Sequence, residues 1–205
     1  HAGSEEVRHR MGLSLVEGIA ALGALDYKAL GLEGLGKPEN YLERQGARWK
    51  AQLESYRELE GWTGPAEIPG VEKVAAWLDS HRPADFQPGI IHGDYHLANV
   101  MYRYDSPELA AIVDWELTTI GDPLLDLGWL LATWPEGNGS GASAVAVTPW
   151  KGFPSAEELV AHYRPRTTRN VDAIEWYAVL ACYKLGIILH NQTIGLFERA
   201  LRWIG

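Results

Sequence analysis

The chain has 205 residues with 46% hydrophobic content, nine tryptophans and a formal net charge of -9. This length and apolar content are sufficient for a buried core, and the length favours a single domain over residues 1–205. The acidic balance argues against a nucleic acid or an anionic membrane as partner, because such surfaces bind clustered Lys and Arg.

Cysteine content and hydropathy bear on the compartment. Cys182 is the only cysteine, so no disulfide can form within the chain, which is compatible with a reducing compartment. No apolar run of about 18 residues is present, and the N-terminus lacks the basic-then-apolar pattern of a signal peptide. We therefore expect a cytoplasmic protein. Because the sequence opens on His1 without an initiator Met, we also expect it to be part of a longer protein.

Helical periodicity covers most of the chain. Apolar residues recur at three- and four-residue spacing, which is the pattern of amphipathic helices. Asp122 followed by Pro123 is a helix start signal, and the Gly- and Ser-rich stretch 137–143 predicts a flexible loop. The helices are predicted at about 8–25, 38–59, 71–80, 124–133, 155–163, 171–191 and 193–204.

Three short β-prone runs lie between the third and fourth of these helices, at 89–92, 99–102 and 109–114. Polar turns separate them, so they predict one short strand followed by a β-hairpin. The expected fold class is therefore α+β, mainly helical, with the strands confined to the middle of the chain.

Polar side chains gather beside these runs. Asp94, Asn99 and Asp114 stand next to apolar strands, where carboxylates are costly unless a cation or hydrogen bonds compensate them. In metal-assisted phosphoryl transfer, one carboxylate orients the attacking hydroxyl, while another carboxylate and an amide oxygen hold magnesium on the nucleotide phosphates. The five-residue step from Asp94 to Asn99 and the later Asp114 fit the His-x-Asp template of kinase catalytic loops.

The motif resembles that of a known family. The segment His92-Gly-Asp-Tyr-His-Leu-Ala-Asn99, followed by Ile112-Val-Asp114, is similar to the hallmark of aminoglycoside phosphotransferase and choline kinase-like enzymes, which share the protein-kinase-like fold. Asp114-Trp-Glu116 and Gly121-Asp-Pro-Leu-Leu-Asp126 further resemble the branch found beside, or fused to, acyl-CoA dehydrogenases.

This resemblance implies a role for each matching residue. Asp94 would be the catalytic base, Asn99 and Asp114 the Mg²⁺ ligands, and Asp126 a buried brace that bonds back to the catalytic loop. ATP would be the phosphate donor, with GTP as an open alternative, and a small hydroxylated molecule would be the acceptor.

The resemblance covers only the C-terminal lobe of that fold. The family begins with a β-rich N-terminal lobe that carries a phosphate-covering loop and a Lys–Glu pair, and this chain opens on predicted helices instead. We therefore expect the N-terminal lobe to be absent from this chain and the isolated chain to be poorly active. No nucleotide-binding residue can be assigned.

Other residues near the motif are open to more than one interpretation. His92 is interpreted as a buried structural imidazole, and His96 as either a substrate-side or a structural residue. Glu116 faces either the metal cleft or solvent. Trp129 and Trp134 are interpreted as core residues. The family builds its acceptor site in later helices, at the positions of Trp176, Tyr177, Tyr183, His190 and Asn191.

Three functions are compatible with these features. The leading one is transfer of the γ-phosphate of ATP to a small-molecule hydroxyl. A zinc-type hydrolase using His92, Asp94 and His96 leaves Asn99 unexplained, and a pseudokinase-like binding module without turnover would use the same fold. The acidic composition suits a cationic acceptor, whereas the dehydrogenase resemblance favours a hydroxyacyl metabolite. The oligomeric state is not predicted.

Overall fold

The computed structural model describes residues 3–58, 64, 68, 70–135, 147–189 and 194–205. This part of the chain is mainly helical with short antiparallel strands, so the predicted α+β class is confirmed. No helix in it is long and apolar enough to cross a bilayer. The α-helices are α1 (Glu5–Gly23), α2 (Glu43–Ser55), α3 (Val71–Ser80), α4 (Leu124–Thr133), α5 (Ala156–Tyr163), α6 (Ile174–Ile188) and α7 (Ile194–Ile204).

The strands form two small antiparallel sheets. β2 (Val100–Tyr102) pairs with β3 (Leu109–Ile112) as the predicted hairpin. β1 (Gly89–Ile91) pairs with β4 (Thr119–Gly121), which the sequence did not predict because Ile120 is its one apolar residue and so no strand pattern is visible. Short 3-10 helices lie at Glu33–Leu35 (η1), Tyr56–Glu58 (η2), Leu97–Asn99 (η4), Trp115–Leu117 (η5) and Arg164–Arg166 (η6).

The second helix begins later than predicted. The sequence pattern placed its start near Pro38, but α2 starts at Glu43. Asn40 has φ of +50°, a left-handed conformation that cannot continue a right-handed helix. The helices predicted at 71–80 and 124–133 match α3 and α4. The loop predicted at 137–143 lies outside the described residues.

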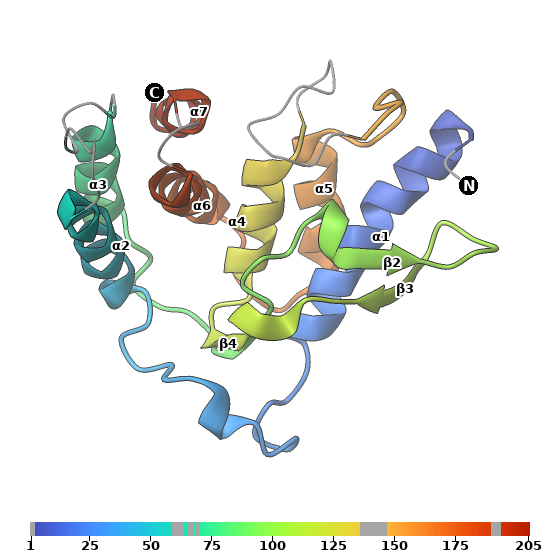
Figure 1. The fold of residues 1–205 in the computed structure, drawn as a ribbon. Helices are drawn as coiled ribbons and strands as arrows, with labels where there is room; N and C mark the ends of the chain where they lie inside the picture. Colours follow the sequence, from blue (N-terminus) through green and yellow to red (C-terminus); the bar gives the residue numbers. More distant parts are fainter. Residues whose placement is uncertain (1–2, 59–63, 65–67, 69, 136–146, 190–193) are drawn as a thin grey trace.

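Helices α4 and α6 occupy the centre of the molecule, with α2 and α3 on one side and α1, α5 and the hairpin on the other (Figure 1). A Cβ at Gly128 of α4 would lie 2.6 Å from the backbone of Tyr177 in α6, so only glycine permits this approach. Arg199 of α7 donates to the carbonyls of Ala132 and Trp134 at the end of α4, both at 2.6 Å. Contacts from α6 and α7 therefore hold α4 in place.

The start of α4 is also fixed by a polar contact. Asp122 is buried and accepts hydrogen bonds from the backbone N–H of Leu124 at 3.0 Å and from the hydroxyl of Tyr177 at 2.5 Å. Burial raises the pKa of Asp122, and the bond from Tyr177 partly offsets that effect. Asp122 therefore stands at the start of α4, as predicted, and also links that helix to α6 through Tyr177.

An ionic cluster joins α1 to the hairpin and to α5. Arg10 binds both carboxylate oxygens of Glu17, at 2.7 and 2.8 Å, and also reaches Glu108 beside β3 at 2.9 Å. His162 of α5 lies 2.9 Å from the same Glu17 carboxylate. The hydrogen bonds from Arg10, followed by those from His162, lower the pKa of Glu17 to about 2. This cluster ties the hairpin to the helical body.

Glu17→Gln should destabilise the fold at neutral pH but not in acid. The pKa of Glu17 falls from about 4.3 in the unfolded chain to about 2 in the fold, so its contribution is present above about pH 4 and disappears toward pH 2. Because Glu17 is partly exposed, we expect a loss of about 1–2 kcal/mol at pH 7. Urea unfolding from pH 7 to pH 3 would measure it, with the exposed Glu6→Gln as control. An equal loss at pH 3 and pH 7 would contradict the assignment.

Candidate active site

A buried carboxylate fixes the start of the loop between β1 and β2, residues 92–99. Asp126 of α4 is 1% exposed and accepts from the backbone N–H of His92 at 2.7 Å and from that of Gly93 at 2.9 Å. Burial raises the pKa of Asp126 to about 6 against the opposing effect of these two donors. Each oxygen thus serves one N–H, which fixes the direction in which the chain leaves β1.

Gly93 allows this turn sterically. Its φ is +91°, and a Cβ at this position would lie 2.6 Å from the carbonyl oxygen of Leu117 in η5. Both features require glycine, since larger residues rarely adopt this conformation. The middle residue of the His-Gly-Asp motif therefore has a backbone role.

His92 connects the loop to the segment that carries Asp114. Its ring is buried, its Nε2 lies 2.8 Å from the carbonyl oxygen of Val113, and its Nδ1 lies 3.3 Å from the backbone N–H of Asp94. The carbonyl can only accept and the backbone N–H can only donate, so the imidazole is neutral with its proton on Nε2. Both ring nitrogens are used inside the protein, which is a structural arrangement.

The carboxylate of Asp94 is surrounded by donors. The indole N–H of Trp129 donates to Oδ1 at 2.7 Å, and the side-chain amide of Asn99 donates to Oδ2 at 3.0 Å. His96 Nε2 lies 3.3 Å from Oδ1. The contact with His96, aided by those with Trp129 and Asn99, lowers the pKa of Asp94 although burial opposes the shift. Asp94 is therefore ionised at neutral pH, with 29% of its side chain exposed.

Asn99 is buried, and the nitrogen of its side-chain amide is hydrogen-bonded whereas the oxygen is not. Its Nδ2 donates to the backbone carbonyl of Asp94 at 2.9 Å as well as to the carboxylate. Its Oδ1 has no hydrogen-bond partner among the described residues. The amide oxygen therefore remains available for a ligand.

Asp114 is brought next to Asn99 by the hairpin. Val113 N–H donates to the carbonyl of Asn99 at 2.9 Å, directly after the pairing of Val100 with Ile112. Asp114 has φ of +68° and is exposed, so the chain turns at this residue. No hydrogen bond or ion pair between described residues joins Asp114 to Asp94 or Asn99, and the described part contains no group of three His, Cys, Asp or Glu placed for a metal ion.

The remaining candidates lie on the rim of the loop. His96 Nδ1 accepts from the backbone N–H of Ala98 at 3.2 Å and so begins η4. Glu116 is exposed in η5 and pairs with no described residue. The ring of Trp115 stands edge-on to His92, with centroids 5.0 Å apart. His96 thus has both a local structural contact and a contact with Asp94, whereas Glu116 faces solvent.

Two further residues near the loop were not identified from the sequence. Trp129 was predicted as core; it is 6% exposed, yet its N–H reaches Asp94. Its position three residues after Asp126 was a usable signal, because residues three apart lie on one helix face. Lys184 of α6 lies with its Nζ 4.7 Å from the centroid of the Trp129 ring. No local pattern connects Lys184 with the motif.

The aromatic residues expected at the acceptor site lie in the core instead. Trp176 donates from its indole N–H to the carbonyl of Leu78 at 2.9 Å, Tyr177 bonds Asp122, and Tyr183 is 2% exposed. Tyr177 lines a pocket that does not include the catalytic loop, and none of these three lines the pocket at Gly93. His190 and Asn191 lie outside the described residues.

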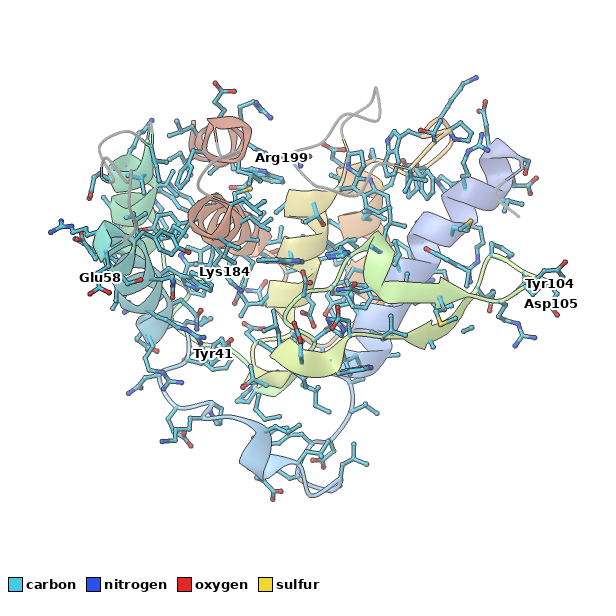
Figure 2. All side chains as sticks on the ribbon, in the orientation of Figure 1. Tyr41, Glu58, Tyr104, Asp105, Lys184 and Arg199 are labelled. Atoms are coloured by element: carbon cyan, nitrogen blue, oxygen red, sulfur yellow. The ribbon has the colours of Figure 1, made fainter. Side chains whose placement is uncertain are left out.

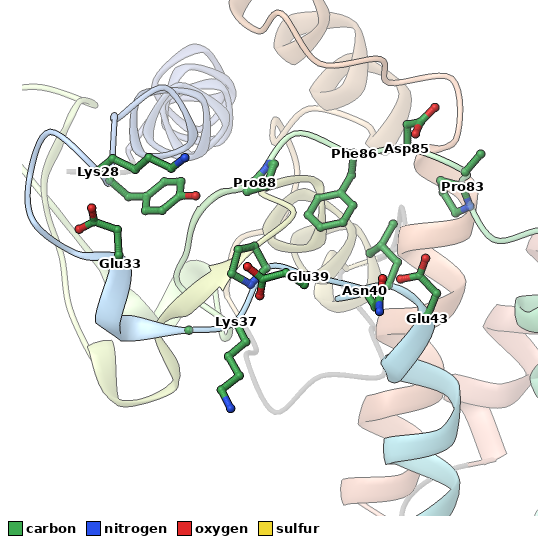
Figure 3. Close-up of a pocket in the computed structure, with 15 residues that line it drawn as sticks. Lys28, Glu33, Lys37, Glu39, Asn40, Glu43, Pro83, Asp85, Phe86 and Pro88 are labelled. Atoms are coloured by element: carbon green, nitrogen blue, oxygen red, sulfur yellow. The ribbon is translucent and has the colours of Figure 1, made fainter.

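Two pockets near the sheets differ in their relation to the loop. A wide pocket of about 690 Å³ (Figure 3) is lined by residues within 27–43 and 83–88, and none of the candidate residues borders it. A smaller pocket of about 120 Å³ touches the loop; its lining includes Gly93, Asp126, Trp129, Arg48, Trp49 and Lys184. Figure 2 shows Lys184 and Tyr41 on the side of α4 that faces α2. The smaller pocket is therefore the one adjacent to the candidate chemistry.

Comparison with known proteins agrees with this geometry. Residues 1–159 match a family described as the phosphotransferase enzyme family. The Acyl-CoA dehydrogenase family member 11 of Gallus gallus is 33% identical to this chain over 199 residues, which cover 91% of the chain but 23% of the relative. The chain therefore spans about a quarter of that relative's length.

Solved structures show the same fold. A Ralstonia eutropha protein with the provisional name of aminoglycoside phosphotransferase is 28% identical, with a TM-score of 0.77 over 98% of this chain and 64% of that one. The GDP and kanamycin complex of an APH(2'') enzyme is 14% identical, with a TM-score of 0.60 over 99% of this chain and 64% of that one. At this identity the second likeness concerns the fold alone.

Replacing Asp126 should destabilise the protein strongly. Asp126→Ala leaves the buried backbone N–H of His92 and the partly buried one of Gly93 without an acceptor, and we expect a loss of about 3–5 kcal/mol. Urea unfolding would measure it. Asp105→Ala at the exposed tip of the hairpin should change stability by less than about 0.5 kcal/mol. Equal stability of the two variants would show that the carboxylate does not brace the loop.

Proposed function

The chain belongs to the phosphotransferase enzyme family, as the motif predicted, and on that premise we propose that it is the catalytic lobe of a small-molecule kinase. The reaction is transfer of the γ-phosphoryl group of ATP, or of GTP, to a hydroxyl of a small molecule. One observation supports this most: the ionised Asp94 carboxylate is fixed by Trp129, Asn99 and His96 on a partly exposed loop.

Asp94 orients the acceptor. Its carboxylate accepts a hydrogen bond from the attacking hydroxyl and directs the oxygen lone pair at the γ-phosphorus. The hydroxyl oxygen bonds to that phosphorus, the bond from phosphorus to the bridging oxygen of the nucleoside diphosphate breaks, and the proton passes to Asp94. Because its pKa is lowered, Asp94 is a weak base, so positioning contributes more than early proton removal.

Asn99 and Asp114 would hold Mg²⁺. Carboxylate and amide oxygens are the ligands that this ion prefers, and Asn99 keeps its oxygen unengaged because its nitrogen bonds Asp94. When bound, Mg²⁺ neutralises charge on the nucleotide phosphates. The hydrogen bond from Val113 to Asn99 keeps the two ligand-bearing segments adjacent.

The geometry counts against the hydrolase alternative. Both ring nitrogens of His92 bond the protein backbone, so this imidazole has no free lone pair for zinc. A pseudokinase-like module without turnover would keep the same loop, and only an activity assay distinguishes it from the kinase.

The acceptor is a small hydroxylated molecule. The GDP and kanamycin complex of a protein with the same fold supports a nucleotide and a small molecule as ligands. Since the chain spans 23% of its Gallus gallus relative, the activity of a whole protein is a proposal here, and we expect this lobe alone to turn over poorly. The cytoplasm remains the predicted compartment.

Asp94→Asn should abolish transfer in the complete gene product. The amide keeps the shape but can neither orient the hydroxyl with a negative charge nor take its proton, so we expect kcat to fall about 10²–10⁴-fold with nucleotide affinity unchanged. A phosphate-transfer screen over hydroxylated metabolites, with Mg²⁺ omitted in a parallel arm, measures this.

Asp105→Asn, at the exposed hairpin tip, is the control and should retain full activity. Turnover retained by Asp94→Asn would refute the assignment of Asp94. Nucleotide binding by the wild-type protein without transfer to any acceptor would favour the pseudokinase-like module.

A further inference from the structure

The small pocket beside the catalytic loop has a positively charged lining. Arg48 of α2 and Lys184 of α6 both border it. Neither forms an ion pair or a hydrogen bond with a described residue; both lie over aromatic rings instead. Cations at a pocket wall usually have a carboxylate partner, so two without one leave an unbalanced positive potential.

The one carboxylate in the lining cannot balance these cations directly. Asp126 is 1% exposed, and its two oxygens already accept from His92 and Gly93. Its charge acts on Lys184 only at a distance. The pocket surface is therefore cationic although the whole chain carries a formal charge of -9.

Two indole rings hold the ammonium group of Lys184 at this wall. Its Nζ lies 4.7 Å from the Trp129 centroid and 5.2 Å from the Trp49 centroid, within the range of cation–π attraction. The indole N–H of Trp49 is buried and has no acceptor among the described residues, which is unusual for a buried donor. The pocket thus offers a fixed cation and borders a donor without a partner.

The pocket is also close to the proposed chemistry. Trp129, whose ring contacts Lys184, donates its N–H to Asp94 at 2.7 Å. A molecule bound at Lys184 is therefore one indole ring away from the carboxylate that orients the acceptor hydroxyl.

We propose that this pocket is an anion subsite for the acceptor, in which Lys184 and Arg48 bind a carboxylate or phosphate group while a hydroxyl of the same molecule reaches Asp94. This inference rests on the proposed function. The pocket volume of about 120 Å³ is the volume that about four water molecules occupy in the liquid. The pocket can therefore hold a charged head group with a few carbons. The acceptor is then a hydroxylated acid or phosphate ester, and not the cation that the net charge suggested.

The test uses matched acceptors with the complete gene product. Hydroxy acids are compared with their primary amides, and sugar phosphates with the free sugars, in steady-state phosphate transfer. Wild-type protein should prefer the charged member of a pair at least about tenfold in kcat/KM, since one charge-assisted contact is worth about 1.5–3 kcal/mol. The pair that shows the preference tells whether carboxylate or phosphate is the natural group.

Lys184→Met and Arg48→Met should remove that preference mainly by raising KM for the charged member of each pair. Lys184→Arg should restore part of it. Lys50→Met, an exposed cation of α2 that does not line the pocket, is the matched control and should retain the preference. Arg48 is exposed, so its variant keeps the fold even if a substitution at Lys184 does not.

Equilibrium binding separates this inference from the proposed function. Titration with acetate and inorganic phosphate, followed by tryptophan fluorescence, should report an anion at Trp49 and Trp129 and should lose its signal in Lys184→Met. Anion binding that depends on Lys184, without phosphate transfer to any acceptor, would support the anion site and reject the proposed kinase activity. Equal transfer to acid and amide, unchanged by either variant, would reject the anion site and retain the kinase. Anion binding that only competes with ATP would assign the cations to the nucleotide and overturn the proposal.

Discussion

The geometry of the candidate site depends on one buried carboxylate that accepts two backbone N–H groups. Asp126 fixes the direction of the chain at His92 and Gly93, and it does so from the middle of the molecule because α4 is itself held by α6 and α7. A loop alone would lose much conformational entropy on adopting a single shape. Here a helix supplies the rigidity, and the same helix places Trp129 against Asp94 one turn later.

A second constraint joins the two halves of the site. His92 bonds Val113 on one side and Asp94 on the other, and the hairpin pairs Asn99 with the segment before Asp114. These bonds require a neutral imidazole with its proton on Nε2. The residues proposed for orientation and for Mg²⁺ therefore belong to segments of one hydrogen-bonded unit, although no hydrogen bond or ion pair among the described residues joins the Asp114 side chain to the others.

The parts that the sequence could predict are those encoded locally. Apolar periodicity gave α3 and α4, and the His-Gly-Asp spacing located the loop because a tight turn needs residues close in sequence. The left-handed conformation at Asn40, which delays α2, and the pairing of β4 with β1 are set by tertiary packing. Trp129 could have been linked to the site by its spacing from Asp126 on one helix face, whereas the contact of Lys184 with Trp129 joins distant segments, and no pattern within one window encodes it.

Trp129 also explains how opposite charges can lie close together and both remain available. The indole N–H is a donor and points at the Asp94 carboxylate, whereas the negative π-face attracts the Lys184 ammonium. A direct ion pair between Asp94 and Lys184 would satisfy each charge and leave neither for a ligand. With the ring between them, Asp94 keeps its capacity to accept from a hydroxyl and Lys184 keeps its capacity to bind an anion. Net charge, summed over the whole surface, cannot describe such a local arrangement, which is why an acidic protein can present a cationic pocket.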